Sequence, residues 1–329
     1  MRAITYESFG PADAVLQAVE MPDPQPAAGD VLIRLKTSGV NPSDVKARAG
    51  ARPGVTKPPF PRIIPHSDGA GVIEAVGDSV DPGRVGERVW IWNGQWQRAF
   101  GTAAEYIALP SAQAVPLPDP ISFEEGATLG IPALTACHAV LGGGPVAGRR
   151  VLVNGSAGTV GRLAVQIAKA HGAQVLATAR GADGFEAART AGADHVFDYT
   201  DPARVDGILE ATEGQPIERI VEVEFGQNAT TNTALIAENG TIASYGSAKE
   251  MEPKLPFYPL MFKAVTIDLI LIYLLDGEKR SAAITHLTDL LNRRALDLRI
   301  SQILPLDACA QAHEIVATGE RSGSVILEI

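Results

Sequence analysis

The chain has 329 residues, of which 46% are hydrophobic and 20% are charged, a composition typical of a soluble globular α/β protein with about two domains. Because 38 acidic residues outnumber 28 basic ones, the net charge is -10 at pH 7. The summed field repels nucleic acid phosphates and anionic membranes, so we expect neither as a principal partner.

The cysteines indicate a reducing compartment. Cys137 and Cys309 are too few for a disulfide framework or a metal knuckle, and we interpret both as small buried hydrophobic residues. The first residues contain no apolar signal core, and the most hydrophobic run, Val265 to Leu275, is too short to span a bilayer. We therefore expect a cytoplasmic protein.

Short β-type runs separated by turns rich in Pro and Gly occupy residues 1 to about 120, with examples at 31–35, 71–76 and 88–92. This spacing predicts a compact, mostly β domain of barrel-like type. From Ser122, which starts a capping box, the segment as far as Leu141 is helical in composition despite Pro132.

Strands and helices then alternate. The pattern predicts strands at 151–153, 174–178, 194–198, 219–223 and 241–245 and helices at 160–171, 183–191, 201–213 and 228–238. This rhythm is typical of a parallel doubly wound sheet, in which ligands bind at the carboxyl ends of the strands. Residues 265–329 add one more strand, a helix over 281–294 and a short β-like ending at 324–329.

The stretch Val151 to Gly161 reads as a strand, a glycine turn and a helix. A helix N-terminus presents unpaired backbone N–H groups and the positive end of the helix dipole to a pyrophosphate. Gly155 would permit the tight turn, Gly158 the close approach of the phosphates and Gly161 close packing of helix on strand. We therefore predict a dinucleotide site that also includes Ser156, Thr159 and Val160; the alternative is an ordinary turn that binds nothing.

Several motifs together resemble the quinone oxidoreductase (zeta-crystallin-like) branch of the medium-chain dehydrogenase/reductase superfamily. Besides the glycine turn, they are GVNPSD at 39–44, PHSDGAGVIEAVG at 65–77, GERV at 86–89, AAEY at 103–106, GATLGIPALTA at 126–136 and AQAH at 310–313. The resemblance covers essentially the whole chain. It implies a GroES-like, mostly β catalytic domain formed by residues 1–122 and 268–329, an inserted Rossmann domain at 123–267, an active site in a cleft, and usually a homodimer.

Zinc-dependent members of this superfamily hold a catalytic metal with residues that are absent here. Asn41 stands at the position of their first cysteine, and Ser67 at that of their histidine. Residues 95–104 contain no cysteine, so the structural zinc lobe is absent as well. We expect a metal-free enzyme. His66 stands beside the lost ligand, and we interpret it as a structural histidine without partners at ligand spacing.

The resemblance implies that Asn41 and Thr135 line the nicotinamide and substrate site. Asn41 either donates an amide N–H to the substrate carbonyl or is only a turn residue before Pro42. Ser43 occupies the position of a proton-relaying hydroxyl. Lys46 replaces a tyrosine that contacts substrate in quinone reductases; it either neutralises a developing oxyanion or points to solvent.

The second strand of the doubly wound sheet ends at Arg180, without the carboxylate that binds the ribose in NAD sites. An arginine fork fits a phosphate, so we predict NADPH. By resemblance Tyr199 also contacts this phosphate, and Ser247 is a further cofactor-binding candidate. Glu222 and Glu224 lie at the same edge of the sheet, where we expect them to be solvated.

These features predict an NADPH-dependent, zinc-independent reductase of quinones or related α,β-unsaturated carbonyls, whose conjugated acceptors spread negative charge without a metal. One alternative is an enoyl-thioester or enone reductase on the same fold. Another is a non-catalytic NADPH-binding protein, crystallin-like or RNA-binding, although the acidic net charge argues against RNA.

Overall fold

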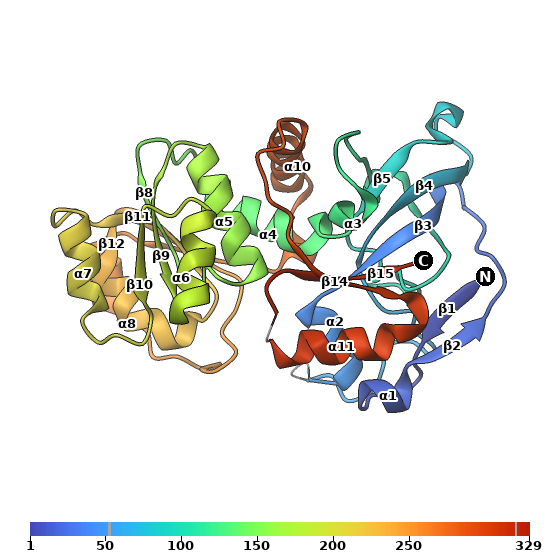
Figure 1. Ribbon diagram of the computed structural model, residues 1–329, viewed down its shortest axis with the longest axis horizontal. Helices are drawn as coiled ribbons and strands as arrows, with labels where there is room; N and C mark the ends of the chain where they lie inside the picture. The colour runs from blue at the N-terminus through green and yellow to red at the C-terminus, as the bar shows by residue number, and fades with distance from the viewer. Residues whose placement is uncertain (52–53, 320) are drawn as a thin grey trace. The chain divides into compact units, whose positions relative to one another are not determined.

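The structure is a computed structural model that describes residues 1–51, 54–319 and 321–329. It divides into two compact units, of which unit 1 comprises Met1–Ile131 and Leu298–Ile329 and unit 2 comprises Pro132–Asp297. Both chain termini, marked in Figure 1, belong to unit 1. None of the helices in the described part of the chain is long and apolar enough to cross a membrane.

Unit 1 is built on a mostly antiparallel sheet of seven strands in the order β14-β15-β3-β4-β5-β7, with β6 paired to β3. A separate pair, β1 and β2, lies outside this sheet. The strands are β1 (Arg2–Thr5), β2 (Gln17–Glu20), β3 (Asp30–Val40), β4 (Asp68–Val76), β5 (Arg88–Ile91), β6 (Tyr106–Pro110), β7 (Ala114–Pro116), β14 (Ile300–Pro305) and β15 (Ser324–Glu328).

Strands from both ends of the chain complete this sheet. The long strand β3 pairs antiparallel with β4, β6 and β15, so the C-terminal strand lies directly against an N-terminal one. The helices of unit 1 are α1 (Ala12–Val15), α2 (Pro42–Ala49), α3 (Phe123–Gly126) and α11 (Cys309–Thr318). Helix α11 packs against α1, α2 and β15, and Figure 1 shows it alongside α2.

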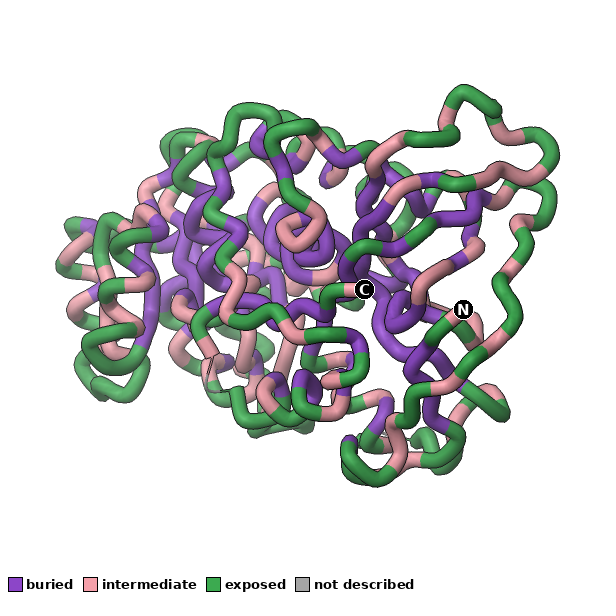
Figure 2. Tube along the Cα trace, turned by 45° about the vertical axis from the view of Figure 1, so that its right-hand side comes forward, coloured by how far each residue is buried: buried purple, intermediate pink, exposed green. Residues whose placement is uncertain are grey.

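Unit 2 contains a six-stranded parallel sheet in the order β10-β9-β8-β11-β12-β13. Its strands are β8 (Arg150–Val153), β9 (Gln174–Ala179), β10 (His195–Asp198), β11 (Ile217–Glu222), β12 (Ile236–Ser244) and β13 (Thr266–Leu269). The order reverses between β8 and β11, which is the switch point of a doubly wound sheet. The inner strands β8, β9 and β11 are almost wholly buried, whereas the edge strands β10 and β13 are half-buried or exposed. The buried segments of the chain are purple in Figure 2. The fold class predicted from the sequence, a GroES-like unit and a Rossmann unit, is therefore confirmed.

Helices surround the parallel sheet. They are α4 (Leu134–Leu141), α5 (Thr159–Ala170), α6 (Gly181–Thr190), α7 (Arg204–Ala211), α8 (Phe225–Leu235), α9 (Phe257–Phe262) and α10 (Gly277–Asn292). The continuous helix expected over 122–141 is interrupted by a π-helical segment, Leu129–Ala133, that contains Pro132. Proline lacks the N–H that the α-helical ladder needs, so the ladder cannot continue through this position.

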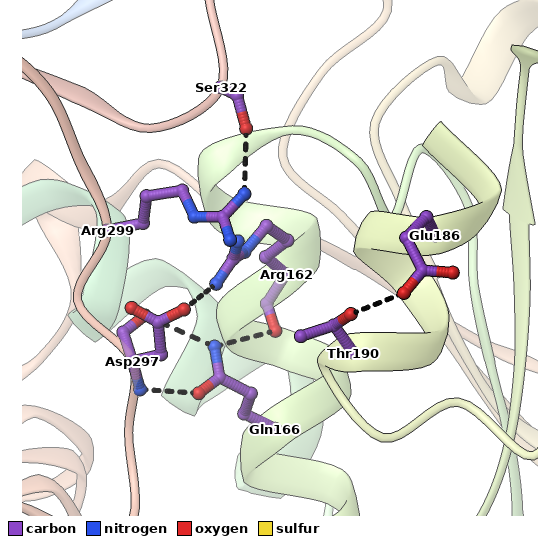
Figure 3. A network of polar contacts seen from close by, with 7 residues as sticks. All are labelled: Arg162, Gln166, Glu186, Thr190, Asp297, Arg299 and Ser322. Carbon is purple, nitrogen blue, oxygen red and sulfur yellow. Dashed lines mark hydrogen bonds and ion pairs between the residues drawn. The ribbon is translucent and has the colours of Figure 1, made fainter. Parts of the chain in front are cut away.

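The segment 268–297, which we expected in the catalytic domain, lies in unit 2 instead. β13 extends the parallel sheet beside β12, and α10 packs on α4. Asp297 is tied to α5, because its carboxylate pairs with Arg162 at 2.5 Å and its backbone N–H donates to the Gln166 side chain at 2.6 Å (Figure 3). These long-range contacts have no signal in the local sequence.

Candidate active site

In unit 2, the glycine turn connects β8 to α5 at the carboxyl end of the parallel sheet. Gly155 has a φ of +70°, in the left-handed region that favours glycine. Gly158 is the N-cap of α5, and no side chain caps the helix. The first N–H groups of α5 have no carbonyl partners within the helix, so they can hold an anion.

The three glycines of the turn differ in the space around them. A Cβ on Gly161 would lie 2.3 Å from the carbonyl oxygen of Gly155, so this glycine lets the helix pack directly on the turn. A Cβ on Gly158 would meet only the Gly155 oxygen, at 3.5 Å. Gly158 is exposed, whereas Thr159 and Val160 are half-buried. The open backbone at Gly158 is therefore the surface that suits a phosphate.

A buried polar network centred on Glu222 includes Asn154, the residue directly before the glycine turn. Glu222, at the end of β11, is fully buried, and its carboxylate accepts N–H groups from Asn154, Asn228 and Asn232 and from the backbone of Glu224. The distances run from 2.6 to 3.1 Å. The expectation that Glu222 is solvated is wrong, because the sequence around it gives no sign of these amide donors.

Replacing Glu222 with Gln is expected to lower the free energy of unfolding by about 1.5–3 kcal/mol, since one acceptor oxygen becomes an NH2 group that faces amide donors. Chemical denaturation would measure this change. Glu210, exposed on α7, provides the control, because Glu210→Gln should change stability by less than about 0.5 kcal/mol. An equal, small effect of both substitutions would contradict a structural role for the network.

The Ser156 side chain points into the protein rather than toward the opening of the turn. Its hydroxyl donates to the Thr178 carbonyl at 2.9 Å, and its backbone N–H donates to the same oxygen at 3.0 Å. The Thr178 hydroxyl in turn donates to the Asn154 side chain at 3.0 Å and accepts from the Gly155 N–H at 3.2 Å. Ser156 thus connects the turn to β9.

Arg180 and Tyr199 flank the carboxyl end of β9. Arg180 is the N-cap of α6 and is exposed, and the Tyr199 backbone N–H donates to the Ala179 carbonyl at 3.2 Å. Asp198, at the end of β10, lies opposite Ala179. Hydrogen bonds from Thr200 and, to a lesser extent, the charge of Arg180 lower the pKa of Asp198. Arg180 and Tyr199 therefore lie next to each other at these strand ends, and their contact with a phosphate stays a prediction.

Three further residues discussed in the sequence analysis also lie in unit 2. The Ser247 hydroxyl accepts the Gly226 N–H at 2.9 Å and donates to the Glu250 carbonyl. It therefore connects the loop after β12 to the start of α8. Glu224 accepts backbone N–H groups from the same loop, including that of Lys249 at 2.8 Å. Thr135 is buried in the first turn of α4.

In unit 1, Asn41 and Asp68 form the central polar pair. Asn41 precedes α2 as its N-cap, and its side-chain N–H donates to the buried carboxyl group of Asp68 at 2.9 Å. The Ile131 backbone N–H donates to the same oxygen at 3.0 Å. Burial, with a lesser contribution from the nearby Asp44, raises the pKa of Asp68 well above its ordinary value. The position of Asn41 is compatible with both predicted roles. It lies at the start of a helix, as a turn residue before Pro42 would, and its side chain has a second amide N–H that could donate to a substrate carbonyl.

Ser43 and Lys46 belong to α2. Ser43 is half-buried in the first turn, and Lys46 is exposed three residues further on. Exposure agrees with the reading in which Lys46 points to solvent.

The residues at the catalytic-zinc position do not fit zinc. The Asn41 side chain offers its N–H to Asp68, and Ser67 provides a hydroxyl in place of an imidazole. Zinc sites in proteins use thiolate, imidazole and carboxylate donors. The donor atoms of Asn41 and Ser67 therefore do not form a zinc site at this position.

The interpretation of His66 as a histidine without partners is wrong. Its Nε2 lies 2.9 Å from Nε2 of His313 and 3.8 Å from Sγ of Cys309. Burial lowers the pKa of His66 well below its ordinary value and that of His313 to about 3, so both rings are neutral. The partners are 243 and 247 residues away in sequence, beyond any local spacing pattern.

Comparison with known proteins decides the family. Residues 27–119 match the alcohol dehydrogenase GroES-like domain, and residues 159–289 match the zinc-binding dehydrogenase family. The quinone oxidoreductase of Rattus norvegicus is 31% identical over 331 residues, which cover 99% of this chain and 97% of that protein. The chain belongs to the quinone oxidoreductase branch of the medium-chain dehydrogenase/reductase superfamily. It is therefore an oxidoreductase.

Solved structures of similar proteins have the same fold. The Escherichia coli quinone oxidoreductase complexed with NADPH is 25% identical and aligns with a TM-score of 0.85 over 100% of both chains. A mycobacterial protein complexed with NADPH is 28% identical, with a TM-score of 0.86 over 100% of both chains.

Proposed function

We propose that this oxidoreductase uses NADPH to reduce quinones or related α,β-unsaturated carbonyls without a catalytic metal. The observation that carries the proposal is the Asn41–Asp68 pair, because these residues place an amide donor where zinc-dependent relatives place metal ligands. An amide N–H polarises a carbonyl oxygen more weakly than zinc does. It suffices for an acceptor whose conjugation spreads the negative charge.

NADPH is proposed for two reasons. Similar quinone oxidoreductases have been solved as NADPH complexes, and the residues of this chain fit the same cofactor. The open backbone at Gly158 and the N-terminus of α5 suit the pyrophosphate, with Thr159 and Val160 in the first turn. The exposed Arg180 and Tyr199 beside Ala179 suit the 2′-phosphate of the ribose.

When bound, NADPH supplies the hydride. The residues of the chain supply orientation and proton transfer. One N–H of the Asn41 side-chain amide donates to Asp68, which fixes the orientation of the amide. We propose that the other N–H of this amide donates to the substrate oxygen. Ser43 provides the hydroxyl that passes a proton to the reduced oxygen, and Thr135 binds the nicotinamide. Lys46 is assigned no catalytic step because it is exposed.

Replacing Ser43 with Ala is expected to lower kcat by about 100-fold with both a quinone and an enone, the usual effect of losing a proton-transfer group. Ser43→Thr should keep most of the activity, because it retains the hydroxyl. Stopped-flow and steady-state consumption of NADPH would measure both variants. Unchanged turnover of Ser43→Ala on both acceptors would show that Ser43 only starts the helix.

We also propose that the enzyme is a homodimer formed through the β13 edge of unit 2. β13 is the last strand of the sheet, and Leu269 on it is 73% exposed. Other large hydrophobic side chains between residues 251 and 274 are exposed as well: Met251, Leu255, Phe257, Tyr258, Met261, Phe262, Leu271 and Leu274. An apolar sheet edge of this kind favours pairing with an identical edge of a second copy.

Leu269→Lys is expected to convert the dimer into a monomer, because paired edges would bring two ammonium groups into an apolar interface. Light scattering after size-exclusion chromatography would measure the mass. Val85→Lys is the control, since Val85 is 51% exposed in unit 1 and should leave the dimer intact. A monomeric wild-type enzyme, or a dimer that Leu269→Lys does not disturb, would contradict this interface.

A further inference from the structure

A compact cluster of two imidazoles and one thiol lies inside unit 1. His66, Cys309 and His313 are all buried, and one nitrogen or sulfur atom from each lies within 4.8 Å of the others. Cys309 packs in an apolar core that includes Val40, Ile64, Leu306, Val316 and Leu327, whereas His66 contacts the polar Ser38. Nothing in the proposed reaction uses these three side chains.

Two features of the backbone bring these groups together: the helical spacing of Cys309 and His313, and the left-handed conformation of His66. Cys309 and His313 are four residues apart on α11, so they lie on the same face of the helix. His66 has a φ of +76°, in the left-handed region where a side chain costs roughly 1–3 kcal/mol. This strained backbone conformation occurs where the His66 ring contacts Cys309 and His313 on α11.

The hydrogen bonds around His66 determine which of its nitrogens carries the proton. The Thr102 hydroxyl donates to the Asp68 carbonyl at 2.6 Å. The Ser38 hydroxyl, 2.8 Å from Thr102, must therefore donate to it, and Ser38 can then only accept from Nδ1 of His66 at 2.9 Å. The proton of His66 is thus on Nδ1, and Nε2 turns its lone pair toward His313 and Cys309.

This is the arrangement that a metal-binding histidine requires. Metal-bound imidazoles usually donate their other N–H to a fixed acceptor, which sets the tautomer and the ring orientation. In His66 the acceptor is Ser38, held in turn by Thr102. The other imidazole differs, because Nδ1 of His313 is buried without a hydrogen-bond partner among the residues that the structure describes. Its proton can move from Nε2 to Nδ1 and give up only the contact with His66.

The two distances from Nε2 of His66 can be compared with those of a zinc site. With Zn–N near 2.05 Å and Zn–S near 2.3 Å, a tetrahedral centre separates N from S by about 3.6 Å and N from N by about 3.3 Å. In the structure His66 Nε2 is 3.8 Å from Cys309 Sγ and 2.9 Å from His313 Nε2. The two imidazole nitrogens must therefore move apart by about 0.4 Å to hold the ion between them.

We propose that Nε2 of His66, Nε2 of His313 and Sγ of Cys309 bind one Zn²⁺ ion, at a site separate from the catalytic-zinc position of the zinc-dependent relatives. This departs from the expectation that the chain has no metal ligands. On binding, the Cys309 thiol loses its proton to solvent and becomes the thiolate ligand, while the proton of His313 moves from Nε2 to Nδ1 and frees Nε2 for the metal. The ion has a structural role and takes no part in hydride transfer.

Two charged groups also act on the thiol, and their effects oppose each other. Burial is the largest influence on Cys309 and raises the pKa of its thiol; the carboxylate of Asp44 raises it further, whereas Arg48, buried on α2, lowers it. The Arg48 guanidinium is held by the Gly10 carbonyl at 2.5 Å. The positive charge of the metal ion is therefore what displaces the thiol proton.

The test is the metal content of the full-length protein, with loading during folding because the site is buried. The chain is produced in medium supplemented with Zn²⁺ or with Co²⁺, purified, and measured by plasma mass spectrometry and absorption spectroscopy. We expect about one ion per chain. The cobalt form should show a thiolate-to-cobalt charge-transfer band and the visible bands of a tetrahedral centre.

Three variants make the result specific. Cys309→Ser should abolish the charge-transfer band and lower metal content at least tenfold. His66→Gly should do the same while relieving the left-handed backbone. Cys137→Ser, at the other buried cysteine, lies in unit 2 and should retain the full metal content and spectrum. Wild-type protein without metal, or equal metal content in Cys309→Ser and Cys137→Ser, would overturn the proposal whatever the reductase activity.

Discussion

Arg180→Ala is expected to raise the KM for NADPH by about 10- to 100-fold and to leave the KM for NADH within about threefold, because only NADPH carries the phosphate that the guanidinium binds. The exposed position of Arg180 beside Ala179 and Tyr199 supports this expectation. Steady-state kinetics with each cofactor at saturating quinone would measure the ratio.

A matched control separates this effect from a general loss of positive charge. Arg189 is also exposed and lies in the last turn of the same helix, α6. Arg189→Ala should leave both KM values within about twofold, since exposed charges at a distance are screened by salt. An equal loss of affinity for NADPH and NADH in Arg180→Ala would refute the assignment of the phosphate to this residue.

Gly158→Ala is expected to weaken NADPH binding by about 10- to 100-fold while changing the free energy of unfolding by no more than about 1 kcal/mol. The added methyl group has room in the protein, since it would meet only the Gly155 oxygen at 3.5 Å. It would, however, occupy the surface proposed for the pyrophosphate. Fluorescence titration of NADPH and thermal unfolding would measure the two effects.

Gly161→Ala should behave in the opposite way. Its methyl group would lie 2.3 Å from the Gly155 oxygen, so the turn must shift, and we expect the protein to lose roughly 1–3 kcal/mol of stability. NADPH binding falls as a consequence of that shift. If Gly158→Ala bound NADPH as tightly as the wild-type chain, the phosphates would not approach the turn there, and the cofactor site would have to lie elsewhere.

The parallel sheet and the glycine turn were predictable because their signals are local. Each strand of unit 2 up to β12 is a short apolar run, and each helix has its own periodicity. Gly155 and Gly161 also behave as predicted from the turn alone, one with a positive φ and the other in close packing. Boundaries were less accurate, as β12 begins at Ile236 rather than at 241.

Features that depend on long-range contacts could not be predicted. His66 meets its partners only because β15 and α11 return the C-terminal residues to the N-terminal unit. From the sequence alone Glu222 looks like an exposed carboxylate, but in the fold it is surrounded by three asparagines, one directly after β8 and two on α8. In each case the single sequence shows the residue type, while the partners come from another part of the fold.

The most direct test of the proposed function is the steady-state consumption of NADPH and NADH by the purified enzyme, with a para-quinone and an aliphatic enone side by side. The enzyme is incubated with EDTA before the assay, so that a solvent-accessible catalytic metal is removed. We expect rapid reduction of the quinone that prefers NADPH and is unaffected by EDTA. Loss of turnover in EDTA, or no turnover of either acceptor despite tight NADPH binding, would contradict the proposed function, whereas turnover of the enone alone would favour the enone reductase alternative.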